Sequence, residues 1–213
     1  MVPPKKPTAK DLIPPRQTHF EVALDKAWQA LGEPAPDRLA QRGATPTDTG
    51  LSLPVLGDTL TVRLPERAIV TSADKPVSSK WQILVLHYLS AAGSPDRRSP
   101  SIVFADLPEA RTYAGVYQGR VVGRLCGTVG RDAATLRAAG DALGARWLDA
   151  GDLALEIDAF PLLPMRLIWY AGDQELPPSA SLLLPDNVAA LLCVEDIVVL
   201  SECLVSRLAG KPF

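Results

Sequence analysis

The apolar residues of this chain recur with two different periods, and the two periods occupy separate blocks of the sequence. Three- and four-residue spacing is typical of a helix with one buried face, whereas strict alternation is typical of a half-buried strand. Gly, Pro or a capping residue such as Asp132 bounds the segments with helical spacing. These segments predict helices over residues 18–31, 36–41, 79–92, 132–143 and 194–209, with a further helix beginning in "TYAGVYQG".

The alternating period falls in two blocks, residues 50–72 and 153–184. The first block predicts an antiparallel meander of about two or three strands with a turn at Gly57–Asp58, and "LALEIDAF", "PMRLIWY" and "SASLLL" form the second. The order of the elements indicates an α+β fold in a single domain, residues 17–210, in which antiparallel β meanders pack with about five to six helices. We expect the Pro- and Lys-rich leader, residues 1–16, to be disordered, because its prolines remove backbone donors.

The composition argues against several classes of protein. The 22 Lys and Arg residues are balanced by 24 Asp and Glu, and the resulting net charge of −2 argues against a nucleic-acid-binding protein. No apolar segment is long enough to span a bilayer and the N-terminus lacks a secretory signal, so we expect no membrane association. The three cysteines form no C-x-x-C pair, which indicates a reducing, cytoplasmic location without a self-contained zinc or iron–sulfur site.

Gly115, Gly119, Gly123 and Gly127 recur at every fourth position and therefore lie along one stripe of a predicted helix. Each glycine costs a helix about 1 kcal/mol relative to alanine, so this helix must depend on tertiary contacts. We interpret the stripe as a place of close packing against another element, since no phosphate-binding loop pattern is present.

His87 is one of only two histidines and lies in the most apolar stretch of the chain, "KWQILVLHYL". At about 100° per residue, Lys80, His87 and Ser90 share a narrow stripe of the helix, and Trp81 and Tyr88 lie on the opposite side. His87 is therefore expected at the edge of the buried surface. This position suits an axial metal ligand or a general base, and it equally suits a structural histidine with one nitrogen on a backbone carbonyl.

Glu156 and Asp158 project from the same face of a predicted strand. Such a pair can share a proton or hold a divalent ion. The alternative is the ordinary polar face of a half-exposed strand. A histidine-based catalytic triad is disfavoured, because it could draw only on His87 and His19.

Aromatic residues form the remaining candidate cluster, in three segments that we expect to converge on one pocket. They are Trp81, Tyr88, Tyr113, Tyr117, Trp169 and Tyr170. Aromatic walls with a few polar groups are typical of a site for a bulky cofactor, although aromatic residues also fill ordinary cores. The loop after Trp169 contains a Gly-Asp turn and a Pro-Pro pair, and it would present Asp173 and Glu175 at the pocket mouth.

Four separated blocks of the sequence are "WQILVLHYL", "FADLPEARTYAGVY", "LPMRLIWYAGDQELPPSASLLLPDNV" and "VEDIVVLSECLVSRL". Together they resemble an uncharacterised bacterial family, domain-of-unknown-function family 3786, over about residues 18–209. The family's Leu-His-Tyr-Leu helix corresponds to residues 86–89. Its Trp-x-Gly-Asp-Glu-Glu-Phe-Pro loop corresponds to residues 169–177, where Gln174, Leu176 and one extra residue before Gly172 depart from the pattern.

The resemblance implies that His87, Trp169 and Asp173 are functional residues, because they lie in the characteristic blocks. Some members look like fusions to a four-cysteine iron–sulfur domain similar to that of corrinoid iron–sulfur proteins. The resemblance therefore implies a protein partner in corrinoid or one-carbon metabolism, although this chain lacks those cysteines.

Three functions are consistent with these patterns. The first is a non-catalytic binding module that holds a tetrapyrrole (corrinoid or haem) or a partner's surface in the aromatic pocket, between residues 79–92 and 153–184, with His87 as axial metal ligand. The second is an enzyme that uses His87, Asp173 and Glu175 as acid–base groups around one cleft. The third is a scaffold or assembly factor without a small-molecule ligand, which requires an exposed apolar patch near the glycine stripe.

Overall fold

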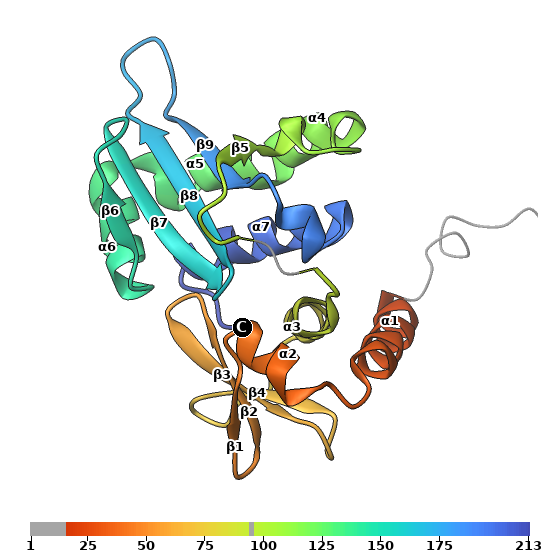
Figure 1. Cartoon of the computed structure of the whole chain (residues 1–213). Coiled ribbons are helices and arrows are strands. Elements are labelled where there is room, and N and C mark those ends of the chain that lie inside the picture. Colours follow the sequence, from red (N-terminus) through yellow and green to blue (C-terminus); the bar gives the residue numbers. More distant parts are fainter. Residues whose placement is uncertain (1–15, 94–95) are drawn as a thin grey trace, which may run out of the picture.

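Two antiparallel sheets and a set of helices make up the fold in a computed structural model, which describes residues 16–93 and 96–213 (Figure 1). Most of the predicted leader, residues 1–15, lies outside the described residues. The first sheet is a meander with the order β1-β2-β3-β4. Its strands are β1 (Thr45–Thr47), β2 (Gly50–Val55), β3 (Asp58–Arg63) and β4 (Ala68–Thr71).

A two-residue turn joins β2 to β3, because Val55 pairs with Asp58. Leu56 and Gly57 both have positive φ, 46° and 74°, as the favoured hairpin turns require. A Cβ at Gly57 would lie 2.2 Å from the carbonyl oxygen of Leu143. The turn is therefore one residue earlier than the sequence predicts, and it also brings this sheet against the end of a helix.

The second sheet has the order β5-β9-β8-β7-β6. Its strands are β5 (Ser101–Val103), β6 (Arg146–Leu148), β7 (Leu153–Phe160), β8 (Leu163–Tyr170) and β9 (Ser179–Pro185). In β8, Met165, Leu167 and Trp169 are buried, whereas Arg166 and Tyr170 are exposed. This alternation leaves one face for the helical layer and the other for solvent.

The helices are α1 (Arg16–Leu31), α2 (Pro36–Gln41), α3 (Ser79–Ser90), α4 (Ala114–Tyr117), α5 (Arg124–Gly127), α6 (Ala133–Ala142) and α7 (Val194–Leu208). A π-helical segment, η3 (Gln118–Gly123), connects α4 to α5. Residues of η3, α5 and α7 pack on the buried face of the second sheet at Leu167 and Leu182. Helix α3 lies between α1 and α7 (Figure 1). None of the described helices is long and apolar enough to cross a membrane.

The α+β class with antiparallel meanders is confirmed, but the interpretation of the glycine stripe is wrong. A Cβ at Gly115, Gly119 or Gly127 would meet nothing within 4 Å, and one at Gly123 would meet only the Gln118 carbonyl oxygen at 3.4 Å. The stripe therefore faces open space. Close packing at a helical glycine occurs instead at Gly140, where a Cβ would lie 2.9 Å from the ring of Trp147.

Candidate functional site

A groove of about 460 Å³ lies between α1, α3, α7 and η3. This size falls within the range of small-molecule sites, about 300–1,000 Å³. Its apolar walls are Phe20, Ala23, Ile83, Leu84 and Val199. Its polar lining residues are Lys80, His87, Arg120, Glu195, Asp196 and Glu202.

His87 is held in this groove by Asp196, from the first turn of α7. The two side chains form a hydrogen bond of 2.8 Å between His87 Nδ1 and Asp196 Oδ2. The His87 side chain is 37% exposed and that of Asp196 is 13% exposed. Because neutral imidazole donates from one nitrogen and accepts at the other, Nδ1 donates to Asp196 and Nε2 is left as the acceptor. Among residues 20–93 and 96–213, none forms a hydrogen bond with Nε2.

The electrostatics of this pair favour a basic imidazole. The hydrogen bond that His87 donates to Asp196 raises the pKa of His87 above its ordinary value of 6.5, and partial burial opposes the rise. Cys193, the residue before α7, donates from Sγ to the same Asp196 oxygen at 3.2 Å. Burial and the Asp196 charge raise the pKa of the Cys193 thiol, so Cys193 is not an activated nucleophile.

The other end of the groove contains a second ion pair. Arg120 Nε lies 2.5 Å from Glu202 Oε1. Lys80 also lines the groove and lies seven residues before His87 on α3, which is about two helical turns. Helix α3 therefore places His87 beside Asp196 and Lys80 about two helical turns away along the groove.

Four of the aromatic residues predicted to line a pocket are core residues, and each has its own partner. Trp81 packs edge-on against Phe213 with ring centroids 5.0 Å apart, and Tyr88 stacks on Phe160 at 4.3 Å. Tyr117 stacks on Phe104 at 4.1 Å and donates a hydrogen bond of 3.0 Å to Ser201. Trp169 donates from Nε1 to the carbonyl oxygen of Gly130 at 2.8 Å.

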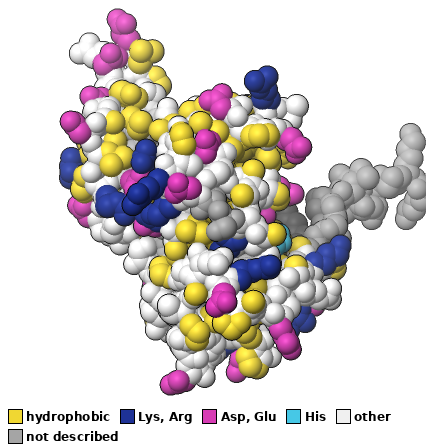
Figure 2. Space-filling model, in the orientation of Figure 1, with side chains coloured by type: hydrophobic (Ala, Val, Ile, Leu, Met, Phe, Trp, Pro, Cys, Tyr) yellow, Lys and Arg dark blue, Asp and Glu magenta, His cyan; other side chains and the backbone are white. Residues whose placement is uncertain are grey.

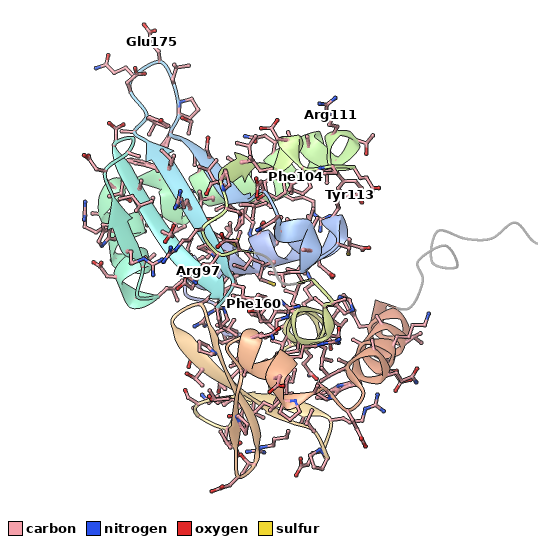
Figure 3. All side chains as sticks on the ribbon, in the orientation of Figure 1. Arg97, Phe104, Arg111, Tyr113, Phe160 and Glu175 are labelled. Carbon is pink, nitrogen blue, oxygen red and sulfur yellow. The ribbon has the colours of Figure 1, made fainter. Side chains whose placement is uncertain are left out.

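The predicted set of site residues is therefore divided among different places. Tyr113 lies in the short 3-10 helix (Arg111–Tyr113) that precedes α4 in the chain, and it is 48% exposed (Figure 3). Of the six aromatic residues, His87 and Asp173 that were predicted to form the cofactor site, only His87 lines the groove between the helices. The aromatic pocket fails to form because hydrophobic periodicity marks a residue as buried without saying whether it faces protein or ligand.

Asp173 and Glu175 belong to the loop between β8 and β9. The Asp173 carboxylate accepts 2.8 Å hydrogen bonds from the backbone N–H groups of Leu176 and Glu175. These bonds lower the pKa of Asp173. The loop lines a separate, open hollow of about 540 Å³ with Arg131, and Glu175 lies at its projecting tip, far from α3 (Figure 3). The acid–base trio of His87, Asp173 and Glu175 is therefore not assembled.

Glu156 and Asp158 belong to an ion-pair cluster on the solvent face of the second sheet. Glu156 pairs with Arg146 and, at 2.6 Å, with Arg166. Asp158 pairs with Arg97 at 2.6 Å and with Arg146 at 3.4 Å. Burial opposes ionisation of Glu156, but the arginine hydrogen bonds outweigh it and the pKa is lowered. Figure 2 shows this cluster as adjoining dark blue and magenta side chains over β7 and β8, and it supports the structural alternative.

Sequence reasoning did not single out Asp196 as a site residue. Its position suggests only a favourable charge at a helix N-terminus. The residue lies 109 positions from His87, and no local spacing rule connects residues so far apart. The sequence does place Lys80 on the same helical stripe as His87, and this shared stripe is the one sequence feature that predicts both residues on the same side of α3.

The fold and the groove together define an α+β protein with an oriented histidine between three helices. The chain belongs to the domain of unknown function family DUF3786, whose model matches residues 35–207. The match runs from just before α2 almost to the end of α7 and leaves out α1. No curated protein and no solved structure matches the chain.

Proposed function

We propose that the protein is a non-catalytic binding module for a metal-centred tetrapyrrole, haem or corrinoid, with His87 Nε2 as an axial ligand. The observation that carries this proposal is the imidazole itself, which Asp196 orients through Nδ1 while Nε2 remains available in an apolar-walled groove. Histidines that bind metals characteristically donate their other ring N–H to a carboxylate or carbonyl, and this raises the basicity of the ligand.

The donor set fits a macrocycle better than a bare metal ion. The described part of the chain contains no group of three or more His, Cys, Asp or Glu residues that could hold a metal. Protein sites for bare transition-metal ions usually supply three or four such ligands. A tetrapyrrole brings four nitrogen ligands of its own, so one imidazole from the protein is sufficient.

The groove supplies the remaining requirements of such a site. Ile83 and Leu84 from α3, Phe20 from α1 and Val199 from α7 offer apolar contact area to the macrocycle. The bound group would supply a metal centre able to bind a further ligand. The chain's own contribution is to orient the imidazole and to cover one side of the macrocycle.

The test is an optical titration of the purified chain with haemin and, separately, with hydroxocobalamin. We expect a shift of the absorption spectrum that His87→Ala abolishes. His19→Ala is the matched control, because it removes the only other histidine, and it should leave the shift unchanged. Asp196→Asn should weaken binding by about 10- to 100-fold, the usual effect of losing an outer-shell partner. The absence of a spectral shift with both compounds would overturn the proposal.

A second candidate is acid–base chemistry at the same pair, because a carboxylate that orients an imidazole also makes an effective general base. The His87–Asp196 pair takes the place of the predicted trio of His87, Asp173 and Glu175, because Asp173 and Glu175 lie in a different part of the molecule. It predicts a metal-free ligand that contacts Nε2. NMR screening of small molecules against the His87 ring resonances would support it if a compound shifts them while haemin and hydroxocobalamin do not. Binding of a tetrapyrrole through His87 would favour the first candidate.

A further inference from the structure

The charges of the groove are distributed unequally between its two ends. Glu195 and Asp196 lie at the His87 end, in the first turn of α7. Lys80 lies about two helical turns from His87 on α3, and Arg120 pairs with Glu202, six residues after Asp196 on α7. A ligand that spans the groove would therefore find an acidic end beside the imidazole and a basic end two helical turns away.

We infer that the ligand of this groove carries a carboxylate, and that Lys80 binds it at the end opposite His87. This inference rests on the proposed function, since it names the chemistry of the ligand in that same site. It selects a tetrapyrrole with free carboxylates, as in haem, over one whose side chains are amides, as in corrinoids.

The spacing along α3 sets the length of the ligand. Lys80 and His87 are seven residues apart, so with a rise of about 1.5 Å per residue their positions lie about 10 Å apart along the helix axis. Ile83 and Leu84 line the groove between them. The ligand that fits this sequence of contacts has a metal or hydrogen-bonding centre at His87, an apolar body, and an anionic group about 10 Å away.

The charge balance identifies Lys80 as the available cation. Arg120 is paired with Glu202, and Asp196 is paired with His87. Glu195 lies beside Asp196, at the end remote from Lys80. Within the described ranges, Lys80 forms no ion pair. An ammonium group at the rim of an apolar groove, with its neighbouring carboxylate already neutralised, is suited to a carboxylate that projects from an apolar ligand.

The experiment compares haemin with its dimethyl ester, in which both carboxylates are masked, on the wild-type chain and on Lys80→Met. Methionine retains an unbranched apolar side chain, so the groove wall is preserved while the charge is lost. Lys75→Met is the control, because Lys75 is exposed in the segment after β4 and does not line the groove. Affinity is measured by titration, and the absorption spectrum reports whether His87 remains the axial ligand.

We expect wild-type protein and Lys75→Met to bind haemin about fivefold more tightly than the ester, the effect of one partly exposed ion pair. Lys80→Met should bind haemin and the ester equally, with the spectrum of His87 ligation unchanged. Equal binding of haemin and ester by the wild type, with His87 ligation present, would overturn the carboxylate inference and leave the proposed function standing. No spectral change with haemin, with its ester or with hydroxocobalamin would overturn both.

Discussion

Replacing Tyr88 by phenylalanine tests whether this residue belongs to the core or to a ligand site. Its hydroxyl group donates to the carbonyl oxygen of Arg42 at 2.9 Å and accepts from the backbone N–H of Leu162 at 3.2 Å. The hydroxyl therefore links α3 to the end of α2 and to the turn between β7 and β8. Burial raises the pKa of Tyr88 to about 12, so the group is neutral and can both donate and accept.

Tyr88→Phe keeps the ring stacked on Phe160 and removes only the oxygen. It leaves one backbone carbonyl and one backbone amide without this partner in a buried place. Each such loss costs at least about 1 kcal/mol, and we expect Tyr88→Phe to lower the free energy of unfolding by about 2–3 kcal/mol. For a chain of this size that corresponds to a fall in melting temperature of about 4–12 °C.

The assay is urea unfolding followed by circular dichroism, with two tyrosine controls. Tyr117→Phe loses a single hydrogen bond, to Ser201, and should cost about 1 kcal/mol. Tyr113 is 48% exposed, and Tyr113→Phe should change the stability by less than about 0.5 kcal/mol. If Tyr88→Phe is no more destabilising than Tyr113→Phe, the placement of Tyr88 in the core is refuted. A loss of tetrapyrrole affinity without loss of stability would restore Tyr88 to the binding site.

Three further predictions concern pH and glycine. Because the pKa of His87 is raised in the folded protein, the His87–Asp196 pair stabilises the fold fully below about pH 6.5, the ordinary pKa of histidine. This stabilisation is lost as the pH rises through the higher pKa of the folded state. Asp196→Asn should remove this pH dependence from unfolding curves recorded between about pH 5 and pH 9. Glu156 has a lowered pKa, so its stabilisation is present above its ordinary value of 4.5 and lost as the pH falls, and Glu156→Gln should flatten the acid limb of the same curves. Gly115→Ala adds a Cβ in open space and should raise the free energy of unfolding by about 0.5–1 kcal/mol. Gly140→Ala forces a Cβ against Trp147 and Leu155 and should lower the free energy of unfolding by about 1–3 kcal/mol. Equal effects of the two substitutions would contradict the assignment of Gly115 as exposed and Gly140 as packed.

Local periodicity accounts for most of the secondary structure. The predicted helices at 36–41, 79–92 and 132–143 match α2, α3 and α6 within two residues, and Asp132 caps α6 by accepting from the Thr135 N–H at 2.8 Å. Three strands lie outside the two alternating blocks: β1, β5 and β6. Each has three residues, which is too short for an alternating pattern to stand out from a loop.

The exposure of His87 was predicted for the same local reason. Its position at the edge of an otherwise buried helix depends only on the 100° rotation per residue and on the apolar residues within two turns. Lys80, His87 and Ser90 are exposed or half-buried, while Trp81 and Tyr88 are buried. The predicted close packing at the glycine stripe is wrong because spacing places the glycines on one face of a helix but does not bring another element to that face.

What the sequence by itself determined is therefore the α+β class, the main helices and strands, and the side of α3 on which His87 lies, because these depend on contacts between near neighbours in the chain. Only the tertiary structure decided that His87 pairs with Asp196, that the predicted aromatic residues fill the core, and that Asp173 belongs to a remote loop. Those outcomes depend on which faces of distant elements meet, and the free energy of that packing is a property of the whole chain that no single segment contains.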